Sequence, residues 1–484
     1  MMKRSILLQL AVMSALACNA QDFLKEYEAF RKQAVENYKS FRQECNKKYV
    51  QFLREAWNSY EMSAPRPVPL DDKPVPPRPY ADGEKADPVE LTPVDVTPVV
   101  VLPQPEPVEP VKEVPSHDEK FFFVDFYGTQ CGVRLPASAN MILNNCTADV
   151  IADAWEQLCT TDRMDNAIHD CLEVRESHNL CDWAYLLFLD ELSRKYCSDR
   201  NGATLLMTYL YCQSGYQIRV ALDGPKLYML YGSRHMIFNK KYFVIDGQDF
   251  YPFGDPSESL EACNAAFEGE TPMSLHIDKE QILGTDLTES RTIRSDLYND
   301  VGADVGVPRS LIEFYDRYPS SAIDGNPMTR WAMYANAPLA GKTKNLLYPA
   351  LADAIGSCRE EEAANKLLNL IQTGLVYEYD EKVWGHDRAF FAEESLYYPY
   401  CDCEDRSILF SRLVRDLLGL DVALIYYPGH LAAAVCFNDD VNGDAVIIDG
   451  RKFVICDPTY IGAPVGTQMP GLDSGNTRAI VLQR

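Results

Sequence analysis

Three residues in the C-terminal part of the chain have the types and the order that acyl transfer through a thiol requires. Cys403 stands at the start of an expected helix, where free backbone N–H groups and the helix dipole favour a thiolate. His430 opens an expected strand and Asp457 closes another. If the two strands are neighbours in an antiparallel sheet packed on the helix, the three side chains converge at one end of that sheet.

This geometry would give each side chain a role. Cys403 would attack an amide carbonyl, His430 would pass the proton to the leaving amine, and Asp457 would hold the imidazole in one tautomer. The backbone N–H of Cys403 is the expected oxyanion donor. Glu404 and Asp405 oppose the dipole through their charge, so the dipole alone does not determine the pKa of the thiol.

At these positions the sequence resembles the transglutaminase-like superfamily, the papain-fold cysteine enzymes with the chain order Cys, His, Asp. The resemblance covers residues 330–460. It is carried by Asp402-Cys403-Glu404-Asp405 before a helix, Gly429-His430 before a strand, and Asp457-Pro458-Thr459 after a strand. It implies a thiol-dependent amide hydrolase or acyl-transferase that acts on peptide or isopeptide bonds of a peptide or protein substrate without a cofactor. It does not choose between water and an amine as the acceptor.

Each of these residues also has a structural interpretation. Cys401 is an alternative nucleophile two residues away, and Cys197 is its counterpart earlier in the chain. We favour Cys403, because the resemblance places the carboxylates directly after the catalytic cysteine. His430 beside an alanine-rich strand can be a structural histidine, and Asp457 before a proline can cap a turn.

A second stretch of the chain repeats this organisation. Both copies place a Tyr-Cys pair before an apolar helix, then a β-branched strand, a histidine and a hairpin with an Asp-Gly turn. The first copy contains Tyr196–Arg200, Asp246-Gly247 and Gly254-Asp255-Pro256. The second copy contains, in the same order, Tyr400–Glu404, Asp449-Gly450 and Cys456-Asp457-Pro458. Their shared order indicates a duplicated unit.

The first copy lacks the nucleophile. Asp199 aligns with Cys403, while His235 and Asp255 are the candidate counterparts of the other two residues. A carboxylate cannot replace a thiolate in acyl transfer by this route. We therefore expect the first copy to be inactive and to bind a substrate or partner, or to shape the neighbouring cleft.

The predicted fold class is α+β, with two papain-like, transglutaminase-like units, each a helix packed on an antiparallel sheet. A long helix and a proline-rich linker precede them. The predicted segments are a signal peptide over 1–20, an amphipathic helix over 22–62, the linker over 63–116, the degenerate unit over 117–267, a connecting segment over 268–300 and the domain with the Cys-His-Asp set over 301–484.

The N-terminal part of the chain is predicted to form a helix with an aromatic stripe, followed by an extended spacer. Aromatic residues recur every 11 positions at Tyr27, Tyr38, Tyr49 and Tyr60, which places them on one stripe of a straight helix. We expect that stripe to pack on the chain's own globular part, on a second copy of the chain, or on another envelope protein. Residues 65–115 hold 15 of the 30 prolines, so we expect an extended spacer there.

Composition and the N-terminus restrict the partners and the compartment. The formal charge of -25 disfavours nucleic acid. The expected signal peptide predicts a periplasmic or secreted protein, and lipidation of Cys18 would instead anchor it to a membrane. The cysteines and histidines show no metal-site spacing, so we expect no metal.

A scaffold in which both units have lost catalysis is the competing hypothesis. An enzyme needs an exposed, acidic Cys403, whereas a scaffold can leave it buried or bonded to a cysteine such as Cys456.

Overall fold

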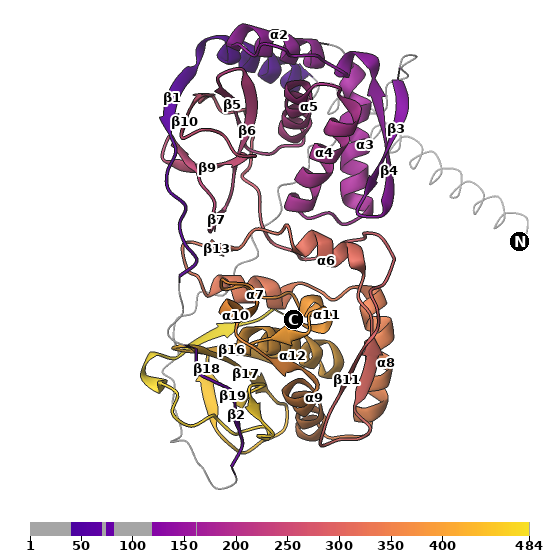
Figure 1. Cartoon of the computed structure of the whole chain (residues 1–484), viewed down its shortest axis with the longest axis vertical. Coiled ribbons are helices and arrows are strands. Elements are labelled where there is room, and N and C mark those ends of the chain that lie inside the picture. Colours follow the sequence, from indigo (N-terminus) through magenta and orange to yellow (C-terminus); the bar gives the residue numbers. More distant parts are fainter. Residues whose placement is uncertain (1–39, 70–73, 82–118, 161, 484) are drawn as a thin grey trace, which may run out of the picture.

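The structure, a computed structural model, describes residues 40–69, 74–81, 119–160 and 162–483 (Figure 1). The predicted signal peptide, the predicted helix up to residue 39 and linker residues 70–73 and 82–116 lie outside the described residues. Figure 1 shows two lobes along the long axis, which we call the first unit (magenta) and the second unit (orange and yellow). Helices and antiparallel sheets occur in both, which confirms the α+β class.

The first unit is a six-stranded antiparallel sheet covered by helices. Its strand order is β1 (Trp57–Glu61), β10 (Ser259–Cys263), β5 (Ile218–Asp223), β6 (Lys226–Gly232), β9 (Gln248–Phe253) and β8 (Phe243–Ile245). The covering elements are the hairpin β3 (Glu119–Phe126) and β4 (Thr129–Pro136) and the helices η1 (Ala137–Ala139), α2 (Ala148–Cys159), η2 (Asp162–Met164), α3 (Asp165–Ser177), α4 (Asp182–Tyr196) and α5 (Arg200–Gln213).

The second unit has a five-stranded antiparallel sheet. Its order is β18 (Ala445–Ile448), β19 (Arg451–Cys456), β17 (His430–Cys436), β16 (Asp421–Tyr427) and β21 (Arg478–Val481). The helices around it are α7 (Thr329–Asn336), α8 (Gly341–Ile355), α9 (Glu360–Gly374), α10 (Asp380–Val383), α11 (Ala392–Tyr397), α12 (Cys403–Leu418) and η3 (Ser474–Asn476).

Short paired strands and one helix complete the described chain. Helix α6 (Arg309–Tyr315) lies between the lobes in Figure 1. The pairs are β7 (His235–Ile237) with β13 (Ser321–Ile323), β11 (Arg291–Arg294) with β12 (Gly302–Val305), β14 (Val376–Tyr377) with β15 (Tyr400–Cys401), and β2 (Arg78–Pro79) with β20 (Tyr460–Ile461).

The two sheets repeat one order of strands. In the first unit, helix α5 precedes a sheet that contains the order β10-β5-β6-β9-β8. In the second unit, helix α12 precedes a sheet with the order β21-β16-β17-β19-β18. These two orders correspond strand for strand along the chain, with β1 added at one edge of the first sheet. This topology supports the duplication that the sequence indicates.

Helix α12 is the central helix of the second unit. Its apolar residues Ile408, Leu409, Phe410, Leu413 and Val414 are each fully buried. Strand β17 is buried from His430 to Val435, and its residues Leu431, Ala433 and Val435 belong to the same core cluster as the helix residues. The helix ends at Gly419, whose φ of 66° is the left-handed conformation that glycine adopts without strain.

The predicted helix over 22–62 is wrong at its C-terminal end. The described helix spans 40–55, and Tyr60 lies in β1, which pairs with β10. Sheet pairing overrides the aromatic repeat there. The described part of the helix packs on its own first unit, because Tyr49 is buried with its ring 5.0 Å from that of Trp155. Of the two predicted modes of packing, docking on the chain's own globular part is the one observed for these residues.

Asn46 provides a test of this docking. Its amide donates to Gln213 Oε1 at 3.0 Å and its carbonyl accepts from Trp155 Nε1 at 3.0 Å, all in the buried interior. Asn46→Ala leaves the buried polar groups of Gln213 and Trp155 without these hydrogen bonds, so we expect the free energy of unfolding to fall by about 2 kcal/mol. Urea unfolding measures it, with the exposed Gln43→Ala on the same helix as the control. Equal stability of the two variants would contradict docking.

We predicted a free spacer over the linker, but its described parts pair with the folded units. Ser63 N–H donates to the Tyr242 carbonyl at 2.7 Å, and Asn239 N–H donates to the Arg66 carbonyl at 2.7 Å, so this stretch follows the first unit. Residues 74–81, which we call the strap, follow the second unit through β2. Proline removes N–H groups but leaves carbonyls and occasional N–H groups that can pair with exposed backbone.

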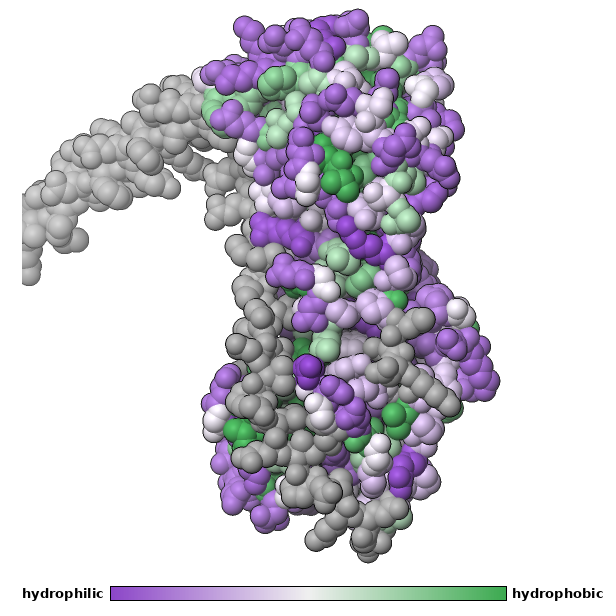
Figure 2. Space-filling view, turned by 90° about the vertical axis from the view of Figure 1, so that its left-hand side faces the viewer, coloured by the Kyte–Doolittle hydropathy of each residue, from purple (hydrophilic) through white to green (hydrophobic). Residues whose placement is uncertain are grey.

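Figure 2 shows one face of the molecule coloured by hydropathy. In Figure 2, hydrophilic residues dominate the described part of the face in view, and apolar residues form small, separate patches. Among the described residues, no helix is both long and apolar enough to cross a lipid bilayer.

Candidate active site

The first turn of α12 is held in place by carboxylates and a guanidinium. Asp405 accepts hydrogen bonds from the backbone N–H of Asp402 at 3.1 Å and of Phe390 at 2.8 Å. The buried Arg406 donates to the carbonyls of Leu375 at 2.8 Å and Pro458 at 3.3 Å. Two of the three residues after Cys403 are therefore structural, and they position the cysteine as the first residue of the helix.

His430 and Asp457 form a buried pair at one end of the sheet. His430 Nε2 lies 2.9 Å from Asp457 Oδ2, and the two residues are 2% and 1% exposed. The other carboxylate oxygen accepts from the backbone N–H of Thr459 at 2.8 Å and of Tyr460 at 3.2 Å. An ionised Asp457 makes Nε2 the protonated nitrogen of a neutral imidazole, so Nδ1 is left as a base. Among the described residues, Nδ1 is buried and has no hydrogen-bond partner.

Cys403 lies beside the strand that His430 opens. Ser407, one turn along α12, donates to the Leu431 carbonyl at 2.9 Å. The backbone N–H of Leu431 also lies against the Cys403 sulfur, where it favours the thiolate and lowers the thiol pKa. Cys403 is thus the first residue of α12, His430 opens β17, and Asp457 follows β19, which is the antiparallel neighbour of β17.

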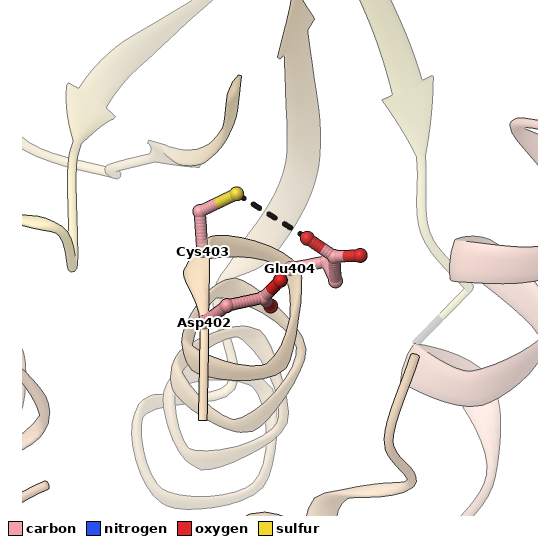
Figure 3. Close-up of side chains that lie close together, drawn as sticks. All are labelled: Asp402, Cys403 and Glu404. Atoms are coloured by element: carbon pink, nitrogen blue, oxygen red, sulfur yellow. Dashed lines mark hydrogen bonds between the residues drawn. The ribbon is translucent and has the colours of Figure 1, made fainter. Parts of the chain in front are cut away.

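The thiol, however, points to a carboxylate. Cys403 Sγ donates to Glu404 Oε2 at 3.3 Å (Figure 3). Within the described part of the chain no hydrogen bond joins Cys403 to His430. Burial, Glu404 and Asp402 together raise the pKa of Cys403 well above its ordinary value. The thiol is thus protonated at neutral pH and only 6% exposed, contrary to the exposed, acidic thiol that an active enzyme needs.

Glu404 provides a test of this electrostatic account. Glu404→Gln removes the negative charge beside Sγ, so the pKa of Cys403 falls and its thiolate fraction at pH 8 rises. We expect alkylation by iodoacetamide to accelerate by about tenfold for each pKa unit lost. Mass spectrometry locates the label, with the exposed Glu381→Gln as the control. An unchanged rate would show that Glu404 does not hold the thiol protonated.

Carboxylates gather around the start of α12. Two groups have ligand atoms within 4.8 Å of one another, namely Asp402 with Cys403 and Glu404, and Asp380 with Asp387 and Glu404. Arg330 pairs with both oxygens of Asp387, and Arg388 N–H donates to Asp380 at 2.6 Å. Burial and then Glu404 raise the pKa of Asp380 to about 8, so it carries a proton at pH 7. Hydrogen bonds and a proton thus account for Asp380 and Asp387, whereas Asp402 Oδ1 is buried without a hydrogen-bond partner among the described residues.

The alternative nucleophile is a structural thiol. Cys401 is 3% exposed in β15, its thiol donates to the Val376 carbonyl at 3.7 Å, and burial raises its pKa to about 11. Its counterpart Cys197 similarly contacts the Ala139 carbonyl at 3.7 Å. Every cysteine in the described residues is free, Cys456 included, so the disulfide considered for a scaffold is not formed there.

The first unit does not assemble the predicted counterparts. Asp199 is the N-cap of α5 and accepts from Gly202 N–H at 2.9 Å, which is a structural role. His235 lies beyond the end of β6, whereas Asp255 follows β9 at the opposite end of that antiparallel pair. The pairing of His235 with Asp255 is therefore wrong. The residue that opens β6, in the place of His430, is Lys226.

Gln372 is a positioning residue that sequence reasoning did not identify. Its side-chain amide donates to the carbonyls of Asp457 at 3.0 Å, Tyr460 at 2.8 Å and Ala463 at 3.0 Å. It lies on α9, well before the site in the chain, and a glutamine in an amphipathic helix carries no signal for this role. The buried Gln372 side chain therefore fixes the loop that carries Asp457.

Comparison of the chain with family models, with curated proteins and with solved structures finds no match in any of the three.

Proposed function

We propose that the chain is a thiol-dependent amide hydrolase or acyl-transferase whose centre is Cys403, His430 and Asp457, in the manner of transglutaminase-like, papain-fold units. One observation carries the proposal. His430 is bonded through Nε2 to Asp457 and has no other hydrogen-bond partner for Nδ1 among the described residues, while the backbone N–H of the next residue, Leu431, lies against the Cys403 sulfur. Nucleophilic catalysis by a thiol needs a proton acceptor within reach of the sulfur, and Nδ1 of His430 is the acceptor that we propose for Cys403.

The proposed reaction has two halves. Nδ1 of His430 takes the thiol proton, Sγ of Cys403 attacks the amide carbonyl, and the imidazolium returns the proton to the leaving amine as the C–N bond breaks. Water or an amine then attacks the thioester, gives its proton to His430 and releases the thiol. Asp457 stabilises the imidazolium and fixes its tautomer. The Cys403 N–H, at the N-terminus of α12, faces the developing oxyanion.

The structure corresponds to a resting state in this proposal. For the first proton transfer, Sγ has to leave Glu404 and approach Nδ1 of His430. In that state the thiolate is stabilised by the imidazolium and by the Leu431 N–H, and it lies farther from the Glu404 charge. A peptide or protein outside the cytoplasm is the proposed substrate, in keeping with the export signal predicted over 1–20.

A second candidate is a binding protein without catalysis. The protonated, buried thiol of Cys403 favours this candidate, as does a first unit without a Cys-His-Asp set. The two candidates differ in whether peptide bonds are cleaved or exchanged.

Separate replacement of two cysteines tests the proposal. We expect Cys403→Ser in the full chain to abolish release of amine from a mixture of fluorescent casein peptides, and Cys401→Ser, the matched control, to retain it. Hydroxylamine as an added acceptor reveals acyl transfer as hydroxamate. Full activity in Cys403→Ser would refute the assignment, and no turnover by the native chain would leave the binding protein as the better account.

A further inference from the structure

The strap, residues 74–81, lies on the two peptide segments that carry His430 and Asp457. Val75 N–H donates to the Gly429 carbonyl at 2.8 Å, directly before His430. Farther along, Tyr80 N–H donates to the Ile461 carbonyl at 2.9 Å. Figure 1 shows β2 crossing the second unit beside the end of its sheet. Both backbone contacts are therefore within a few residues of the proposed centre.

Side chains strengthen this contact. The ring of Tyr80 packs edge-on against that of Tyr460 at 5.5 Å, and Val75 packs on the same small apolar cluster, which includes Ala463 and Met469. Tyr460 is also one of the two residues whose N–H groups bind Asp457. The strap thus contacts the residue that orients the carboxylate.

The surface under the strap is built by the second unit itself. Gln372 holds the loop from Asp457 to Ala463 through three carbonyls, and Gly462 N–H donates back to its amide oxygen at 3.1 Å. The turn that ends in Gly429 is the hairpin between β16 and β17. Since these bonds do not involve the strap, the surface persists when the strap leaves.

The chemistry of the strap shows what kind of ligand this surface takes. Residues 74–80 read Pro-Val-Pro-Pro-Arg-Pro-Tyr, an extended segment with three backbone N–H groups. Two of these, those of Val75 and Tyr80, pair with the second unit. Strand β2 pairs in parallel with β20, a two-residue strand that has no other strand partner among the described residues, and main-chain pairing of this kind is a general mode of peptide recognition.

We propose that β20 and the Pro428-Gly429 turn form the docking surface for an extended, proline-containing peptide substrate, and that the strap occupies this surface in the resting chain. The inference rests on the proposed function and names its substrate class. The strap is tethered at Arg66, which pairs with Asp249 of the first unit at 2.5 Å, so its effective concentration is high. A substrate peptide competes with it through the same backbone pairing.

Two strap variants of the full chain test the proposal. Tyr80→Ala removes the contact with Tyr460, and Val75→Pro removes the N–H that binds Gly429. We expect each variant to raise the rate of Cys403 alkylation by iodoacetamide at least about tenfold, because the strap then occupies the docking surface for a smaller fraction of the time. The thermal midpoint should stay unchanged. Phe123→Ala, an exposed aromatic residue of the first unit, is the control. Unchanged rates in both strap variants would overturn the proposal.

A synthetic peptide of residues 74–81 then tests the surface directly. Added to Tyr80→Ala, it should bind, as measured by fluorescence anisotropy, and slow the alkylation of Cys403, whereas a scrambled peptide should do neither. Equal binding of the two peptides would overturn the docking surface. If the native peptide protects Cys403 but His430→Ala in the same background leaves the alkylation rate unchanged, the docking surface stands and the catalytic assignment fails.

Discussion

Replacing His430 with alanine should reduce amide cleavage by at least about a thousandfold, within the range expected for removal of a general base and acid. In the proposed mechanism the imidazole takes the thiol proton, whereas Glu404, the present partner of Sγ, raises the pKa of Cys403. Without it the thiol stays protonated and the leaving amine gains no proton. Single-turnover release of amine from the casein peptides measures the loss.

The matched control is His386→Ala, an exposed histidine of the second unit. It should leave the rate unchanged. Circular dichroism and the thermal midpoint establish that His430→Ala is folded, because a loss of fold would imitate a loss of catalysis. Retention of a tenth or more of the native rate by a folded His430→Ala would mean that another base serves Cys403.

Replacing Asp457 with alanine should lower the free energy of unfolding by about 3–5 kcal/mol, the cost of breaking a buried pair by removal of one partner. The carboxylate is 1% exposed and binds His430, Thr459 and Tyr460. Its removal leaves three buried donors unsatisfied. Urea unfolding measures the change, with the exposed Asp439→Ala as the control.

Asp457→Asn separates stability from catalysis. The amide oxygen of asparagine can still accept from Thr459 and Tyr460, so we expect less than half of the destabilisation of the alanine variant. Its amide nitrogen donates to Nε2 and moves the imidazole proton to Nδ1, the nitrogen that must accept the thiol proton. A stable but inactive Asp457→Asn is the expected result. An active Asp457→Asn would contradict the tautomer assigned here.

The second unit illustrates what a sequence pattern can predict. The helix at Cys403 and the strands before Asp457 and from His430 follow from apolar periodicity, an Asp-Gly turn and a glycine after the helix. These are local signals, and their assembly into one antiparallel sheet needs little further information. The direction of the Cys403 thiol was not predictable, because Glu404 adjoins it in the chain and only its side-chain orientation decides whether it binds the sulfur.

The first unit and the N-terminal segments show why other predictions failed. The aromatic repeat reaches Tyr60, but Trp57–Glu61 pairs with β10, whose sequence lies about 200 residues farther on. Proline content predicted a free spacer, and the few N–H groups between the prolines pair with the folded units instead. His235 was matched to His430 by its order along the chain, although the strand register puts it at the opposite end of the sheet.

The central claim is that Cys403 forms an acyl thioester with the help of His430. Reaction of the full chain with p-nitrophenyl acetate, followed by mass spectrometry of the cysteine peptides, tests it most directly. The account predicts one acetyl group on Cys403, formed with a burst of nitrophenol and lost in His430→Ala, while Cys401 stays unmodified. An unacetylated Cys403 in the native chain, or acetylation that is equally fast in His430→Ala, would contradict it.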